Sequence, residues 1–469
     1  MNIPKTFSEA RKALAQGSTV RQLAEAALAE AGRRKDLNAF LELFPESALA
    51  KADEVDAKLR AGHAGVLAGM LVSIKDNICY KGHRVSASSR ILEGFTSLYS
   101  ATVVERLLAA DAVIIGRTNC DEFAMGSSNE NSAYGNVRNP LDPTKVPGGS
   151  SGGAAASVAA GIVHVALGSD TGGSIRQPAS FTGTIGFKPT YGRVSRYGLI
   201  AFASSFDQIG PFAHDVEDIA SVYGVIAGND PHDSTTSRRQ NEPIVLSDSG
   251  KLHIGYFREG LERPGMDPEV VTHLQAQIDR LRSEGHTVDP VEVPLLDHQV
   301  PTYYILATAE ASSNLARFDG IHFGHRSKEA KGVEETYRLS RSEGFGPEVK
   351  RRILLGTFVL SAGYYDAYYA KAQRVRRILR DRTLEAFERC DLLMGPTCPS
   401  TAFAPGEITD PVAMYLQDIF TVQANLAGTP AISLPTGTHS NGLPFGVQLM
   451  ARPFDEARLL SAAKTLFGA

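Results

Sequence analysis

The sequence predicts an α/β fold in which a twisted, mixed β-sheet is covered by helices on both faces. Short apolar runs typical of buried strands, such as 113–116 and 163–167, alternate with segments whose apolar residues have helical spacing. No internal repeat and no convincing linker divides the 469 residues. We therefore expect a single domain, residues 66–469, with a helical N-terminal segment, residues 1–65, packed on it.

The first half of the chain begins with helices. Thr19 and Gln22 match a capping box that opens the first clear helix, and a largely charged helix follows at 47–59. The pattern then predicts strands at 70–74, 113–116 and 163–167, and helices at 102–110 and 151–161. The helix at 102–110 also starts with a capping-box pattern, since Thr102 precedes Glu105 by three residues.

The second half continues the alternation. We expect helices at 215–227, 267–284, 349–388 and 455–467, and strands at 252–257, 287–293, 391–394, 431–435 and 444–450. The polar stretch 229–250 is interpreted as a long surface loop, and the charged stretch 317–346 as a mobile insertion or a covering loop. Tyrosines at helical spacing usually pack in a core, and the chain has them at Tyr364, Tyr365, Tyr368 and Tyr369.

Composition excludes several classes of protein. The chain is 43% hydrophobic and 21% charged, as globular proteins are, and its net charge of −4 gives no electrostatic footprint for nucleic acid. The sequence shows no signal peptide and no apolar run of membrane-spanning length. The cysteines lack C-x-x-C and zinc spacing, which predicts a reduced, cytoplasmic protein without a metal site: Cys79, Cys120, Cys390 and Cys398.

The glycine-rich stretch 147–174 is the centre of the functional interpretation. Turns at 148–153 and 170–176 each carry a serine, and the helix and strand expected between them bring the two turns to one place. Glycine lets the backbone approach a ligand closely. The Lys-Ser/Thr pair of a phosphate-binding P-loop is missing, and the flanking elements argue against a flexible linker. A catalytic or anion-binding loop and a structural turn remain the alternatives.

Lys75 adds a possible base to these serines. It ends the apolar run 71–75, and a lysine beside a buried strand can point into a cleft. Burial lowers the lysine pKa from about 10.4, which allows the amine to accept a proton. A lysine with a serine is a known nucleophile–base arrangement.

These segments together resemble the amidase signature family. The motifs GGSSGG at 148–153, DTGGSIR at 170–176 and GFKPT at 186–190, with Lys75 upstream, match the spacing of that family's Ser–cis-Ser–Lys triad. The resemblance implies that Ser174 is the nucleophile, that Ser150 bridges it to Lys75, and that neutral Lys75 is the general base.

The resemblance also implies local backbone features. We expect a cis peptide bond between Gly149 and Ser150. The turn before the nucleophile would supply an oxyanion hole from consecutive backbone N–H groups, those of Thr171, Gly172 and Gly173.

Within the family, segments 121–126, 204–211 and 361–368 resemble the glutaminase subunits of tRNA-dependent amidotransferases. That resemblance implies that Arg352, or alternatively Arg351, holds the α-carboxylate of glutamine and that Asp418 holds its α-ammonium. Further substrate contacts are expected from Tyr304, Met125, Gly126 and Ser127.

The same resemblance implies the reaction and the partners. Glutamine would be hydrolysed to glutamate and ammonia, and the ammonia would convert mischarged Glu-tRNA(Gln), Asp-tRNA(Asn) or both. The chain would need no cofactor of its own, because a B subunit uses ATP and Mg²⁺ and holds most of the tRNA, while a small C subunit clamps the glutaminase to the B subunit. The alternatives are a free-standing amidase acting on another amide and a catalytically silent scaffold.

Several of these residues also have structural interpretations. Ser151 is expected to be a helix N-cap, and Asp170 and Arg176 a bracing ion pair. Arg352 can brace its helix through an acidic neighbour, and Asp418 can cap the helix that follows it.

Overall fold

A single mixed sheet runs through the computed structural model, which describes residues 3–240, 244–292 and 295–468. Its strands within these residues are β1 (Phe40–Leu43), β2 (Leu71–Lys75), β3 (Val113–Thr118), β4 (Val165–Asp170), β5 (Ile185–Lys188), β6 (Gln208–Ala213), β7 (His253–Phe257), β8 (Thr287–Val291), β9 (Leu392–Pro396), β10 (Ala431–Thr438) and β11 (Pro444–Met450). They are ordered β1-β3-β2-β4-β6-β5-β10-β11-β9-β7-β8. Strand β2 is parallel to β3 and β4, and β7 is parallel to β8 and β9, whereas the central pairs are antiparallel.

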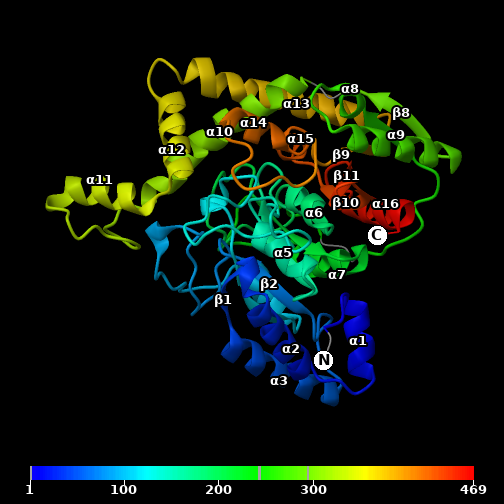
Figure 1. Cartoon of the computed structure of the whole chain (residues 1–469), viewed down its shortest axis with the longest axis horizontal. Coiled ribbons are helices and arrows are strands. Elements are labelled where there is room, and N and C mark those ends of the chain that lie inside the picture. The colour runs from blue at the N-terminus through cyan, green and yellow to red at the C-terminus, as the bar shows by residue number, and fades with distance from the viewer. Residues whose placement is uncertain (1–2, 241–243, 293–294, 469) are drawn as a thin grey trace.

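Helices surround this sheet, as Figure 1 shows. They are α1 (Phe7–Ala15), α2 (Val20–Arg33), α3 (Pro45–Ala61), α4 (Thr102–Ala109), α5 (Gly152–Ala159), α6 (Arg176–Thr182), α7 (Val216–Ile226), α8 (Glu259–Glu262), α9 (Pro268–Ser283), α10 (Leu296–Asn314), α11 (Gly332–Gly344), α12 (Pro347–Leu360), α13 (Lys371–Ala386), α14 (Pro411–Tyr415), α15 (Val422–Ala427) and α16 (Glu456–Phe467). A π-helical turn, η5 (Asp366–Ala370), joins α12 to α13. The arrangement confirms the predicted α/β fold with a mixed sheet flanked by helices.

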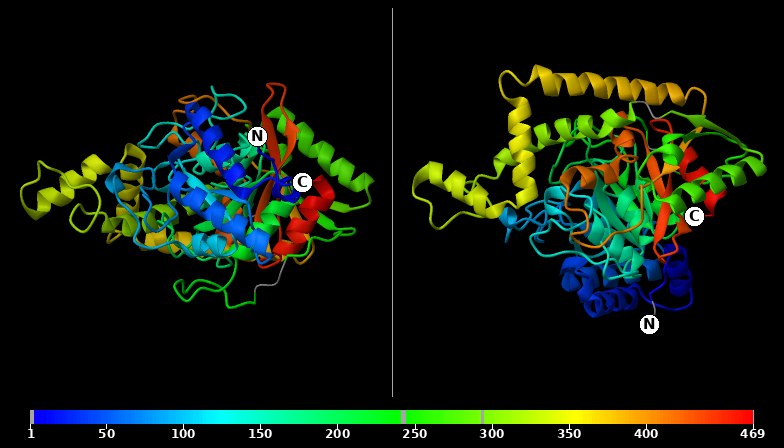
Figure 2. Two further views of the ribbon diagram at one scale, coloured as in Figure 1. Left: turned by 90° about the horizontal axis from the view of Figure 1, so that it is seen from below. Right: turned by 45° about the horizontal axis from the view of Figure 1, so that its top comes forward.

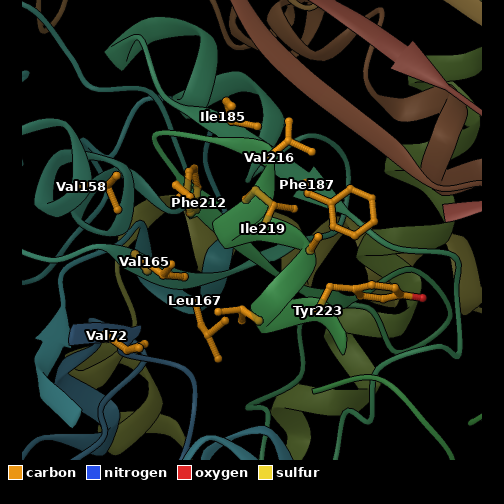
Figure 3. Close-up of a cluster of buried hydrophobic side chains, with 14 of the residues drawn as sticks. Val72, Val158, Val165, Leu167, Ile185, Phe187, Phe212, Val216, Ile219 and Tyr223 are labelled. Atoms are coloured by element: carbon orange, nitrogen blue, oxygen red, sulfur yellow. The ribbon is translucent and has the colours of Figure 1, made fainter. Parts of the chain in front are cut away.

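The main hydrophobic core lies between the central strands and their helices (Figure 3). Val165 and Leu167 of β4 lie in the same buried cluster as Phe212 of β6 and Ile219 of α7. Strand β4 is buried along its whole length, and its first four residues, 165–168, form an apolar run rather than an alternating pattern. This is why the sequence predicted a strand here.

A second hydrophobic cluster joins α10, α13 and α15 to β9. In Figure 1 these helices form a layer at the top of the molecule. This layer contacts the glycine-rich turn after β4, since a Cβ added to Gly172 would lie 2.6 Å from the ring of Tyr303 in α10. The helical layer therefore forms part of the surroundings of the candidate site.

The structure differs from the predicted elements at several points. Residues 1–65 are not helical throughout, because β1 pairs antiparallel with β3 at the edge of the sheet. Thr102 does not cap α4: the N-cap is Ala101, and the Thr102 hydroxyl donates to Asp230. The capping box at Thr19 is confirmed.

The charged stretch 317–346, expected to be a loop or insertion, contains helix α11. Tyr364, Tyr365 and Tyr368 are exposed, so the expectation that they pack in a core is wrong. In the predicted loop 229–250, residues 229–240 and 244–250 contain no helix or strand, and 241–243 lie outside the described residues. The predicted strand 287–293 ends at Val291, and Val293 is outside the described residues. None of the described helices has the length and apolar character needed to span a bilayer.

Candidate active site

Lys75 is the last residue of β2, and its side chain is completely buried. Its Nζ lies 2.7 Å from Ser150 Oγ, 2.9 Å from Ser151 Oγ and 3.0 Å from Ser169 Oγ. The adjacent Asp76 carboxylate pairs with Arg117 and not with Lys75. Burial lowers the pKa of Lys75 below its ordinary value, although more distant acidic groups oppose the shift.

The serine hydroxyls around Lys75 constrain where its protons lie. Ser151 Oγ donates its one proton to the Ser169 carbonyl oxygen at 3.1 Å, so it can only accept from Lys75. Ser169 Oγ already accepts a hydrogen bond from Asn77 Nδ2 at 2.9 Å. A neutral amine that donates to Ser151 and Ser169 keeps its lone pair for the proton of Ser150. The cluster therefore suits a lysine that acts as a base towards Ser150.

The peptide bond between Gly149 and Ser150 is cis, as predicted. The Gly149 N–H donates to Gln177 Oε1 at 2.9 Å, and the Ser150 carbonyl accepts from the Asp121 N–H at 3.1 Å. A Cβ at Gly149 would lie 2.2 Å from Asp121 Oδ2, so no larger residue fits. The backbone on both sides of the cis bond is thus fixed by buried polar partners.

Ser174 lies in the turn between β4 and α6 and is 8% exposed. Its carbonyl accepts from the Ser151 N–H at 3.2 Å, which joins the two glycine-rich turns. Among the described residues, no hydrogen bond links the Ser174 hydroxyl to Ser150. The structure thus contains the Lys75–Ser150 contact, and the Ser150–Ser174 hydrogen bond stays a prediction. Catalytic hydrogen bonds often shorten only when substrate binds.

The predicted oxyanion donors form the turn just before Ser174. Gly173 has φ of 145°, a conformation that favours glycine. Within the described chain, no acceptor is bound to the backbone N–H groups of Thr171, Gly172 or Gly173. The Thr171 hydroxyl donates to Asp207 at 2.7 Å, which fixes the start of the turn. The turn therefore holds unused backbone donors beside the candidate nucleophile.

Asp170 and Arg176 form the expected bracing ion pair under this turn. Arg176 Nη2 lies 2.9 Å from Asp170 Oδ1, and both side chains are fully buried. Burial alone would raise the pKa of Asp170, but the Arg176 guanidinium lowers it to about 2. Arg176 also donates to the Thr421 carbonyl and to Asn425, which attaches the turn to α15.

Arg352 and Asp418 are both buried, although they come from α12 and from the segment before α15. Arg352 Nε donates to Glu348 at 2.8 Å, and its guanidinium lies 5.1 Å from the ring centre of Tyr304 and 5.6 Å from that of Tyr415. The contact with Glu348 is the one expected if Arg352 braces its helix, and it leaves the role of Arg352 in substrate binding a prediction.

Asp418 does not cap the following helix with its carboxylate, which instead accepts from the Ser127 hydroxyl at 2.6 Å. A Cβ placed on Gly173 would lie 3.3 Å from Asp418 Oδ1, so the carboxylate is adjacent to the candidate oxyanion turn. Burial raises the pKa of Asp418 to about 7, while Ser127 and the more distant Arg352 oppose the rise. A buried carboxylate that accepts from Ser127 and has no ion-pair partner among the described residues suits a cationic ligand.

A cavity of about 210 Å³ brings together three of the predicted substrate contacts, Gly126, Ser127 and Arg352, whereas Asp418 and Tyr304 are not part of its lining. Arg351 also lines it, but its side chain is 53% exposed and pairs with Glu348. Met125 is buried in the second hydrophobic cluster and does not line this cavity.

Comparison with known proteins assigns this arrangement to a family. The amidase family matches residues 22–460. The chain belongs to the amidase family. It is 56% identical over 459 residues to the A subunit of glutamyl-tRNA(Gln) amidotransferase from Koribacter versatilis (strain Ellin345), covering 94% of each chain. It is 51% identical to the protein of the same name from Chlorobium phaeobacteroides (strain DSM 266 / SMG 266 / 2430), covering 98% of each.

Solved structures of amidases have the same fold. The crystal structure of the A subunit of glutamyl-tRNA(Gln) amidotransferase from Thermotoga maritima has a TM-score of 0.79 at 40% identity, covering 99% of this chain and 96% of that one. The native peptide amidase from Stenotrophomonas maltophilia has a TM-score of 0.82 at 29% identity, covering 98% and 96%.

The amidase site contains residues that the sequence did not single out. Ser169 contacts Lys75 and directly precedes the DTGGSIR motif. Its position beside the motif could therefore have marked it as a site residue. Tyr415 and Glu348 surround Arg352, and no local pattern marks them. Ser151 occupies the expected N-cap position of α5, but its hydroxyl makes no capping bond and contacts Lys75 instead.

Proposed function

We propose that this chain is the glutaminase subunit of an amidotransferase that converts mischarged Glu-tRNA(Gln), Asp-tRNA(Asn) or both to the correctly charged tRNAs. The observation that carries the proposal is a fully buried lysine in contact with the serine of a cis peptide, in a chain 56% identical to the A subunit of a glutamyl-tRNA(Gln) amidotransferase. The enzyme is thus part of an ATP-dependent carbon–nitrogen ligase that uses glutamine as its amide donor.

The reaction proceeds through an ester on Ser174. Ser174 Oγ attacks the side-chain amide carbon of glutamine while its proton passes to Ser150, whose own proton passes to Lys75. The carbon–nitrogen bond then breaks, and the same relay returns the proton to the departing ammonia. Water, deprotonated by the relay, hydrolyses the ester and releases glutamate.

The surroundings of Ser174 stabilise the charges of this reaction. The N–H groups of Thr171, Gly172 and Gly173 donate hydrogen bonds to the amide oxygen and so stabilise the negative charge that develops on it. Arg352 binds the α-carboxylate, and Asp418 binds the α-ammonium beside Gly173. The contacts of Asp418 with Ser127 and of Arg352 with Tyr304 support these roles, because they orient both charged groups.

The released ammonia is used elsewhere in the complex. Converting a carboxylate into an amide requires that one carboxylate oxygen be activated as a leaving group, so the B subunit carries the ATP and Mg²⁺. The B subunit also holds most of the tRNA, and a small C subunit joins this chain to the B subunit. This chain itself binds glutamine and no cofactor, and the complex acts in the cytoplasm.

Ammonia release from glutamine tests the proposal. The purified chain is assayed alone, then with the B and C subunits of its own organism, ATP and mischarged Glu-tRNA(Gln), and the Ser174→Ala variant serves as the control. We expect glutamine-dependent formation of Gln-tRNA(Gln) that the variant abolishes. Hydrolysis of simple neutral amides with no turnover of glutamine in the full mixture would contradict the proposal and favour a free-standing amidase.

A further inference from the structure

An exposed apolar surface covers the outer side of α12 and the turn after it. It consists of Leu354, Leu355, Phe358, Tyr364, Tyr365 and Tyr368, and we name it the α12 surface; Leu354 alone is 71% exposed. The Phe358 ring centre lies 4.3 Å from that of Tyr364 and 5.6 Å from that of Tyr368, so these side chains form one patch rather than scattered contacts. Contiguous apolar patches on a protein surface commonly mark interaction sites.

A groove extends this surface towards α11. Its volume is about 460 Å³, and Tyr337, Phe345, Ile353 and Leu354 supply apolar parts of its lining. Figure 1 and the right view of Figure 2 show α11 and α12 at one end of the molecule, where α11 extends away from the sheet. The two helices therefore form a concave corner that the rest of the described chain leaves open.

The exposed charged side chains around the α12 surface are mainly basic, although the chain as a whole has a net charge of −4. Within residues 347–380 six exposed side chains are basic and one is acidic, and two of the basic ones, Arg351 and Arg377, pair with Glu348 and Asp381. Lys350, Lys371, Arg374 and Arg377 are exposed along this segment, and Asp366 is its exposed acidic residue. A partner that complements this surface has apolar side chains in its centre and acidic side chains at its border.

We propose that the α12 surface binds another subunit of the amidotransferase through an apolar segment bordered by acidic residues. The inference rests on the proposed function, in which this chain works with further subunits. The buried side of the same helix carries Glu348 and Arg352, so the bound partner is separated from the substrate pocket by one helix, about 10 Å across.

The composition of the surface favours protein over RNA. Leu354, Leu355 and Phe358 offer apolar contact and no hydrogen bonds, which suits another protein's side chains. The Phe358 ring lies against those of Tyr364 and Tyr368 and is not free on both faces to stack on bases. RNA binding at this surface is therefore an outcome that would contradict the proposal.

Assembly of the complete complex tests the inference. The Kd for assembly with the B and C subunits of the same organism is measured by calorimetry for the parent chain, for Leu354→Asp and for Phe358→Asp. The matched control is Val66→Asp, which changes a residue that is also 71% exposed but lies in the segment between α3 and β2. We expect at least a tenfold rise in Kd for both α12 variants and an unchanged Kd for the control, with the melting temperature unchanged in all three.

Hydrogen exchange tests the same surface without a substitution. We expect the amides of residues 354–368 to be protected in the assembled complex relative to the free chain. A complex that forms and makes Gln-tRNA(Gln) while 354–368 stay unprotected, or while Leu354→Asp assembles like the parent, overturns this inference and leaves the proposed function intact. Loss of tRNA binding with unchanged subunit binding also overturns it. A chain that joins neither partner and supports no amidation overturns both.

Discussion

Glutamine binding is expected to weaken as the pH falls through neutrality, because Asp418 must be ionised to bind the α-ammonium. Burial raises the pKa of Asp418 to about 7 in the free protein, so the carboxyl is largely protonated below that pH and largely ionised above it. The negative charge of Asp418 that attracts the ammonium is therefore present above about pH 7 and is lost as the pH falls below it. From about pH 8 to about pH 6 the ionised fraction decreases roughly tenfold, and kcat/KM for glutamine should decrease by the same factor through this group.

The assay compares glutamine with a neutral amide that lacks an ammonium group. Lys75 also titrates, but it serves both substrates, so the ratio of the two kcat/KM values removes its contribution. The ratio should fall roughly tenfold between about pH 8 and about pH 6 in the parent. In Asp418→Asn the ratio should be lower at every pH and should not change with pH, because losing one partner of a buried charge contact costs about 2–5 kcal/mol.

Two results would refute this reasoning. One is a substrate ratio that stays constant from about pH 6 to about pH 8 in the parent. The other is an Asp418→Asn variant that loses activity equally on glutamine and on the neutral amide. Either would mean that Asp418 supports the fold through Ser127 rather than binding the ammonium.

Three further predictions concern the catalytic serines and lysine. Ser174→Ala should abolish hydrolysis without unfolding the chain, and mass spectrometry of the parent with a slow substrate should find the acyl group on Ser174. Acylation of Cys120 instead would contradict the serine mechanism; burial raises the pKa of this thiol to about 12. Lys75→Met should lose most activity, and kcat/KM of the parent for a neutral amide should rise with pH as Lys75 loses its proton; a profile that does not change with pH would exclude the general base. Ser169→Ala should lower kcat roughly tenfold with little change in KM, because one hydrogen bond that orients the Lys75 amine is lost. Ser169→Thr keeps the hydroxyl and should restore kcat. Full activity in the alanine variant would show that this contact does not position Lys75.

The candidate catalytic centre could be located in the sequence because its parts are short, local motifs. Lys75 ends an apolar run, a position from which it can point into a cleft, and the structure buries it; the glycine-rich turns contain Ser150 and Ser174. The surroundings of Arg352 could not be predicted in this way. Tyr415 reaches Glu348 from 67 residues away, and only the folded chain brings them together.

The fold was predictable where burial produces a strong pattern. Strands β2, β3 and β4 are buried at every residue, and their apolar runs are unambiguous. Strand β1 has four half-buried residues, too few for an alternation to be recognised. Helix α11 is largely polar, with few buried residues, so the signal of a packed helix is weak. The exposed tyrosines after α12 show that helical spacing alone does not reveal what a face contacts.

Helix α12 shows how tertiary packing decides between two neighbouring arginines. Val349, Arg352, Gly356 and Val359 are its buried residues at three- and four-residue spacing, so Arg352 lies on the inner face and Arg351 outside it. A Cβ at Gly356 would lie 2.0 Å from the Thr308 carbonyl oxygen, which means that glycine alone allows α12 to approach α10 this closely. The same approach brings the Arg352 guanidinium over the ring of Tyr304, which also belongs to α10. The buried arginine of the pair is therefore Arg352. The apolar pattern alone does not decide between the two, because the exposed Leu354, Leu355 and Phe358 lie at helical spacing from Arg351.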